Sequence, residues 1–133
     1  MIAARQVKHM LAAAEEKALL LGVPVNIAVL DAGAHLTAFI RMDGAVLGSI
    51  DLAIRKAKTA VLFATTSESV WDYCKPGAPA PTLELSNGGL APFAGGIPVK
   101  GANGEVIGAV GVSGGAVSQD LEIAEAAIAA WNG

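Results

Sequence analysis

The feature that most constrains the fold is a glycine-rich stretch in which two apolar segments, Gly96 to Val99 and Glu105 to Val112, are joined by a Gly-Ala-Asn-Gly turn. Glycine and asparagine adopt the positive φ that tight turns need, so this stretch predicts a β-hairpin. Gly108 and Gly111 lie inside the second strand, where glycine usually marks a bulge or the close approach of another backbone or a ligand. Ser113-Gly114-Gly115 then opens a helix. The stretch therefore predicts close packing at the end of a sheet.

Helical and extended patterns follow one another through the rest of the chain. Apolar residues recur at spacings of three and four from Ala3 to Leu21, which predicts an amphipathic helix that ends at Gly22. Val25 to Leu30 and His35 to Met42 flank a turn and predict a second hairpin. Further helices are expected at Ser49–Ala64, with Ser49 as N-cap, at Ser67–Tyr73 and at Ser118–Trp131. The long connection from Lys75 to Pro92 shows no periodicity, and a fifth short strand is expected around Leu90 to Phe93.

These elements predict an α+β fold in a single domain spanning residues 1–133. Because both strand pairs are hairpins, we expect a central antiparallel sheet of four to five strands, flanked by helices. Hydrophobic residues make up 53% of the chain and aromatic residues only 5%, so small aliphatic side chains must fill the core. The last helix carries more alanines on one face than a soluble helix needs, and such an apolar patch favours a homo-oligomer, a dimer or larger. These alanines are Ala124, Ala126, Ala127, Ala129 and Ala130.

Charge and hydropathy exclude several classes of partner. The formal net charge of −3 argues against nucleic acid, which favours a basic surface. No apolar run is long enough to cross a membrane. The N-terminal segment has helical periodicity and lacks the regions of a signal peptide, so a cytoplasmic protein is expected. The single cysteine, Cys74, excludes an intramolecular disulfide framework.

His9 and His35 are the only histidines and the candidate metal ligands. Neither lies on a predicted helix four positions from another histidine, a cysteine or an acidic residue, so a tetrahedral zinc site is not indicated. A haem iron needs only one axial histidine, and haem therefore remains open. For each histidine, a structural or surface role is the commoner alternative.

A second group of residues could bind a small anion. Arg41, beside Asp43 at the end of a strand, could hold a carboxylate through a bidentate contact, or it could be a solvated ion pair. Lys56 and Thr59 could face the same cleft from their helix, or face solvent. Ser113 and Gly114 precede a helix whose N-terminus favours anions. A hydrolase nucleophile at Ser113 is not supported, because no histidine follows it in the chain.

Three blocks in this order resemble the GlcG/HbpS-like family, which includes haem-binding sensor proteins and the C-terminal domain of PduO corrinoid adenosyltransferases. The blocks are DAGAHLTAFIRMDGA (31–45), AIRKAKTAVLFATTS (53–67) and GGIPVKGANGEVIGAVGVSGGAVSQD (95–120). Positions that match the family's pattern include Arg41, Asp43, Lys56, Thr59, Gly95, Gly96, Ser113 and Gly114. The resemblance implies a profilin-like or PAS-like α+β fold, oligomeric assembly and, for several members, haem.

Three functions follow from these observations. The first is a small-molecule-binding protein for haem or a related tetrapyrrole, with His9 or His35 as axial ligand. The second is an enzyme acting on a small carboxylated metabolite held by Arg41 and the helix start at Ser113. The third is a non-catalytic, oligomeric accessory protein.

Overall fold

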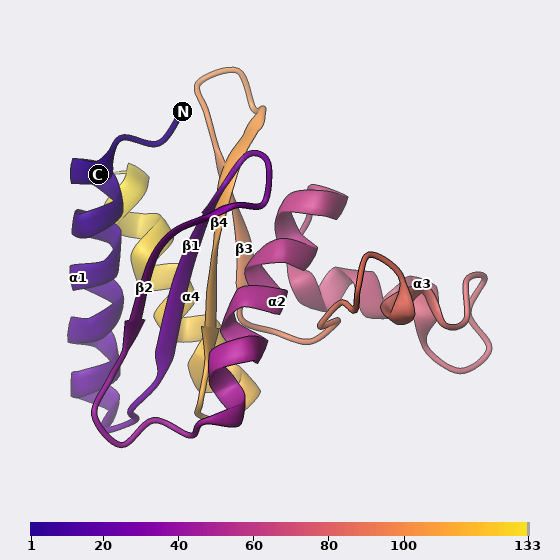
Figure 1. Cartoon of the computed structure of the whole chain (residues 1–133), viewed down its shortest axis with the longest axis horizontal. Helices are drawn as coiled ribbons and strands as arrows, with labels where there is room; N and C mark the ends of the chain where they lie inside the picture. The colour runs from indigo at the N-terminus through magenta and orange to yellow at the C-terminus, as the bar shows by residue number, and fades with distance from the viewer. Residues whose placement is uncertain (133) are drawn as a thin grey trace.

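The two expected hairpins form one four-stranded antiparallel sheet in the order β2-β1-β4-β3. In this computed structural model, which describes residues 1–132, the strands are β1 (Asn26–Asp31), β2 (Leu36–Arg41), β3 (Gly96–Lys100) and β4 (Val106–Ser113). β1 and β4 pair in the centre, and β2 and β3 form the edges (Figure 1). The predicted fold class is confirmed with four strands. The residues around Leu90 to Phe93 form no strand.

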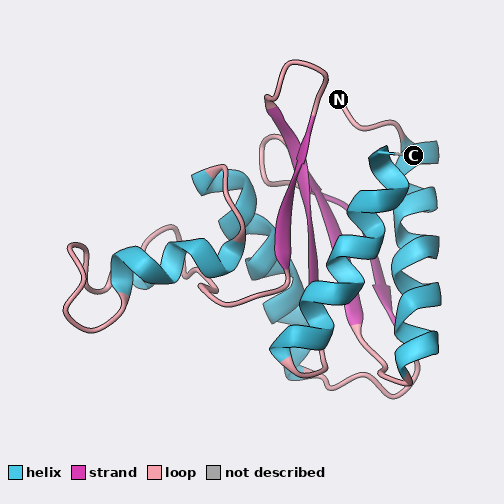
Figure 2. Ribbon diagram, turned by 180° about the vertical axis from the view of Figure 1, so that it is seen from behind, coloured by secondary structure: helices cyan, strands magenta, loops and turns pink. Residues whose placement is uncertain are grey.

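Three long helices cover the two faces of this sheet. α1 (Ala4–Leu21) and α4 (Val117–Asn132) lie side by side on one face, and α2 (Gly48–Phe63) lies on the other (Figure 2). Strand alternation separates the two cores, because successive side chains point to opposite faces. Ile27 and Val29 join the core beneath α1 and α4, whereas Leu30 packs beneath α2.

α2 begins one residue earlier than its sequence pattern predicts. Leu47 occupies the N-cap position with helical dihedral angles, and Ser49 lies inside the first turn, where it is buried. The expectation that Ser49 caps this helix is therefore wrong, since the N-cap position has no side-chain hydrogen bond and belongs to Leu47. The C-terminal end of α1 is as expected, with Gly22 in the left-handed region at a φ of 70°.

The connection between α2 and β3 carries short helical turns. A 3-10 turn, η1 (Ser67–Val70), continues into α3 (Trp71–Cys74), in agreement with the expected short helix, and η2 (Leu83–Leu85) interrupts the loop that follows. This segment extends away from the sheet (Figure 1). The loop returns to the sheet at Gly95, directly before β3.

Glycine inside the strands allows α2 to lie directly on the sheet. A Cβ at Gly111 would overlap the carbonyl oxygen of Ala53 and lie 2.7 Å from the amide nitrogen of Ala57, both in α2. A Cβ at Gly96 would likewise overlap the carbonyl of Lys56. The close approach that the sequence predicts at Gly111 is confirmed, and the approaching group is the backbone of α2.

No helix among residues 1–132 has both the length and the apolar character needed to cross a membrane.

Candidate functional site

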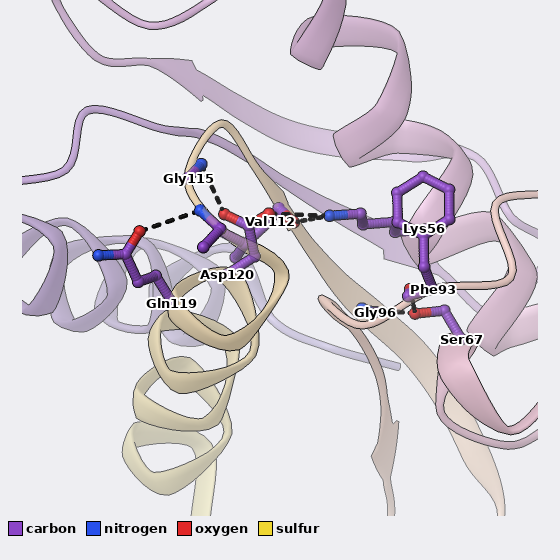
Figure 3. A network of polar contacts seen from close by, with 9 residues as sticks. Lys56, Ser67, Phe93, Gly96, Val112, Gly115, Gln119 and Asp120 are labelled. Atoms are coloured by element: carbon purple, nitrogen blue, oxygen red, sulfur yellow. Dashed lines mark hydrogen bonds and ion pairs between the residues drawn. The ribbon is translucent and has the colours of Figure 1, made fainter.

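A buried ammonium, that of Lys56, lies on the side of α2 that faces the sheet. Lys56 is fully buried, and its Nζ donates to the carbonyl oxygen of Val112 (2.9 Å) and to Oδ2 of Asp120 (3.1 Å) (Figure 3). The other carboxylate oxygen of Asp120 accepts the N–H of Gly115 at 2.9 Å. Burial lowers the pKa of Lys56, and the Asp120 carboxylate opposes this shift. The ion pair therefore joins α2 to the start of α4.

The loop before β3 closes over this lysine. The ring centroid of Phe93 lies 5.0 Å from Lys56 Nζ, within the range of a cation–π contact. Gly95 has a φ of 131°, and a Cβ there would lie 2.9 Å from the same Nζ. The Ser67 hydroxyl donates to the Phe93 carbonyl (2.6 Å) and accepts the N–H of Gly96 (2.9 Å). These contacts hold the loop and the lysine in one arrangement.

The turn between β4 and α4, where the sequence predicts an anion site, already bonds to side chains of the same helix. The Gly115 N–H donates to Asp120, and the Ala116 N–H donates to Oε1 of Gln119 at 2.9 Å (Figure 3). Ser113 is 3% exposed. Two of the donors that a bound anion would use are therefore occupied by the chain itself.

Arg41 and Ser113 lie at the same end of the sheet, on either side of Asn26. Asn26 is the register partner of Arg41 in β2 and of Ser113 in β4, and residues opposite one another point to the same face. The Asn26 amide is fully buried and donates to the carbonyl of Val46 (3.2 Å). Arg41 itself is exposed. Asp43 lies beyond β2 in an exposed turn.

Thr59, one turn after Lys56, has a separate role. Its hydroxyl donates to the Arg55 carbonyl (2.7 Å) and accepts the N–H of Ala91 (3.0 Å), which ties the long loop to α2. The structure therefore divides the predicted anion-binding residues. Those gathered around the start of α4 are Lys56, Gly95, Gly96, Ser113 and Gly114, whereas Arg41, Asp43 and Thr59 lie outside this group.

His9 is exposed and lies elsewhere, in an open surface cavity of about 600 Å³ between the N-terminal half of α1 and the end of α4. The cavity is lined by Arg5, Gln6, Lys8, His9, Ala130 and Trp131. Trp131 is held by a hydrogen bond from its indole Nε1 to the carbonyl of Lys100 (3.1 Å). Within residues 1–132 the His9 imidazole has neither a hydrogen bond nor an ion pair, so its ring nitrogens remain available to a ligand.

His35 lies in the exposed turn between β1 and β2. Its side chain is 80% exposed, and its Nδ1 lies 3.3 Å from Oδ1 of Asp31. The same carboxylate oxygen accepts the backbone N–H of His35, and this hydrogen bond is the main cause of the lowered pKa of Asp31. His35 therefore contributes to the local structure of the turn, and the His35 imidazole faces solvent.

Four residues at these two places were missed by sequence reasoning: Asp120, Phe93, Ser67 and Trp131. Asp120 had a detectable signal, because Lys56 shares its helix face with Ala53, Ala57 and Ala60, and a lysine on such a small-residue face needs a buried counter-charge. The positions of the other three depend on how the loop before β3 and the C-terminal end of α4 pack in the folded protein. Sequence spacing contains no information about that.

A family model described as "Haem degrading protein HbpS-like" matches residues 2–129. Among curated proteins, an uncharacterised 15.0 kDa protein in the dhaT-dhaS intergenic region of Citrobacter freundii is 43% identical over 122 residues, covering 91% of this chain and 85% of that protein. The corrinoid adenosyltransferase PduO of Salmonella typhimurium is 42% identical over 121 residues; the match covers 90% of this chain but only 36% of that protein.

Among solved structures, the crystal structure of a PduOC:heme complex superposes with a TM-score of 0.91 at 38% identity. It covers 97% of this chain and 94% of the other.

Proposed function

The chain belongs to the HbpS-like family, and on this basis we propose that it binds haem in the cavity between α1 and α4, with His9 as the axial ligand. A relative with the same fold was crystallised with haem. The observation that carries the proposal is the unpaired His9 imidazole in a cavity of about 600 Å³.

The residues around this cavity fit the chemistry of haem. A neutral imidazole nitrogen is a common axial ligand of haem iron. The indole of Trp131 offers a flat apolar surface to a porphyrin, and its hydrogen bond to Lys100 fixes the ring. Arg5 and Lys8, also in the lining, can pair with the two propionates. His9, Trp131, Arg5 and Lys8 therefore supply a ligand, a stacking surface and counter-charges.

The alternative, an enzyme that grips a small carboxylate between Arg41 and the start of α4, has less support. The Gly115 and Ala116 N–H groups donate to Asp120 and Gln119. Arg41 is exposed on the edge strand β2 and is separated from Ser113 by Asn26 of β1. We therefore propose no second function at this end of the sheet.

Self-assembly and cytoplasmic location stay predictions. Of the five alanines that motivated the assembly prediction, Ala124 and Ala127 are fully buried in the core of the chain. Only Ala126, Ala129 and Ala130 retain exposed surface that a second copy could cover.

Titration with hemin tests the haem proposal. We expect a saturable, shifted Soret band for the unaltered protein, and at least roughly tenfold weaker binding for His9→Ala, because the iron loses its protein ligand. His35→Ala is the matched control, since it removes the other histidine from an exposed turn, and its titration should follow that of the unaltered protein. An equal loss of hemin affinity in both variants, or no loss of affinity in His9→Ala, would contradict the assignment of His9 as the axial ligand.

A further inference from the structure

A second hollow, well separated in sequence from the His9 cavity, lies where α3, the loop before β3 and the start of α4 meet. It has a volume of about 600 Å³ and is lined by Glu68, Trp71, Pro92, Phe93, Ala94 and Val117. Trp71 is 45% exposed, Phe93 37% and Val117 51%. Five of its six lining residues are apolar. An exposed apolar hollow of this kind is commonly a ligand-binding site.

The one charged group in its lining is the carboxylate of the half-buried Glu68. Oε2 of Glu68 is buried and has no hydrogen-bond partner within residues 1–132. Buried polar atoms are almost always hydrogen-bonded, because the loss of water without a replacement partner costs free energy. Glu68 also lines a neighbouring hollow of about 550 Å³ that contains a second carboxylate, Glu125. Neither lining includes a lysine, arginine or histidine, so the surroundings of Glu68 favour a cation.

We propose that this hollow binds a small organic ammonium compound: a primary amine with an aromatic or aliphatic body. The ammonium N–H groups would satisfy Glu68 through a charge-assisted hydrogen bond, and the apolar body would pack against Trp71 and Val117. An ammonium beside the Trp71 indole gains a further cation–π attraction.

Phe93 fixes the orientation of the bound amine. Its ring already contacts the buried Lys56 ammonium at 5.0 Å, so a second cation at the same ring would meet like charge. The ligand's apolar end is therefore expected at Phe93 and its ammonium at Glu68 and Trp71. This arrangement discriminates amines from neutral and anionic compounds of the same shape.

The test compares three probes of nearly equal shape: benzylamine, benzyl alcohol and benzoate. Chemical-shift perturbation of the ¹⁵N-labelled protein measures the binding of each. We expect saturable shifts at residues 68–71 and 93–94 for benzylamine, binding at least roughly tenfold weaker for benzyl alcohol, and none for benzoate. Glu68→Gln keeps the shape of the side chain and removes its charge. It should reduce the affinity for benzylamine to the affinity that the unaltered protein has for benzyl alcohol.

Glu125→Gln is the matched control, because it removes the neighbouring carboxylate and leaves Glu68 in place. If Glu125→Gln abolishes binding and Glu68→Gln does not, the ammonium site is the adjoining hollow and the proposal is wrong. Equal binding of benzylamine and benzyl alcohol to the unaltered protein would also overturn it, whatever the folding of the variants. The His9→Ala variant should bind benzylamine normally, which separates this site from the proposed haem site.

Discussion

Asp120→Ala is expected to lower the free energy of unfolding by about 3–5 kcal/mol, because it leaves the Lys56 ammonium buried without its counter-charge. Lys56 is fully buried and Asp120 is 1% exposed, so bulk water does not reach the ion pair. The substitution also removes the acceptor of the Gly115 N–H at the start of α4. Urea denaturation followed by circular dichroism measures the change.

Glu122→Ala provides the matched control. Glu122 pairs with Lys17 at 3.7 Å, but both side chains are substantially exposed, 49% and 36%. A surface ion pair contributes about 0–1 kcal/mol, so this variant should differ little from the unaltered protein. If Asp120→Ala lowers the free energy of unfolding by no more than Glu122→Ala does, the buried ion pair does not stabilise the fold.

The cost of Asp120→Ala should also depend on pH. Burial lowers the pKa of Lys56 below 10.5, and Asp120 opposes that shift, so its removal lowers the pKa further. Between the folded and unfolded pKa values, the unfolded chain binds more protons than the folded one, and stability therefore rises with pH. The deficit of Asp120→Ala relative to the unaltered protein should narrow as pH increases toward 10.5. A constant deficit across this range would mean that Lys56 does not lose its proton in the folded variant.

Gly111→Ala should destabilise the protein by about 3 kcal/mol, at the upper end of the usual cost of overpacking. The new methyl group would overlap the Ala53 carbonyl and lie 2.7 Å from the Ala57 amide nitrogen. Both obstacles are helix backbone, which cannot rotate away as a side chain can. α2 would have to move off the sheet, and Lys56 would move with it. Thermal unfolding measures the loss.

Gly48→Ala is the control for this substitution. Gly48 lies in the first turn of α2, its φ is not in the left-handed region, and no atom lies within 4 Å of the position that the new methyl group would take. Alanine has the higher helix propensity, so Gly48→Ala should leave stability unchanged or raise it by about a few tenths of a kcal/mol. An equal loss of stability in both variants would show that glycine is needed at these positions for backbone flexibility, and not because a larger side chain would clash.

Much of the fold could be predicted from the sequence because its signals are local. The turn glycines and the apolar segments on either side of them indicate both hairpins, and the helical spacing of α1 locates it within one residue. Gly111 indicated a bulge or the close approach of a backbone or a ligand. That the approaching group is the backbone of α2 could not be predicted from the sequence, since hydrophobic periodicity does not say which helix covers which face.

The candidate sites were harder to predict because they combine distant segments. The pairing of Lys56 with Asp120 spans 64 positions, and the cavity around His9 joins both ends of the chain. Ser113 and Gly114 were interpreted as a possible anion site from their place before a helix. Their neighbours Gly115 and Ala116 donate to the chain's own side chains instead, a use of helix N-terminal donors that is common and leaves no distinct sequence signal.

The most direct test of haem binding at the α1–α4 cavity is the ¹⁵N spectrum of the protein with hemin added, because the paramagnetic iron broadens nearby amide signals. We predict that broadening is strongest at the residues that line this cavity, which are residues 5, 6, 8, 9, 130 and 131. The turn around His35 should keep sharp signals. Broadening centred on residues 31–36, or spread evenly over the surface, would contradict the assignment of His9 as the haem ligand.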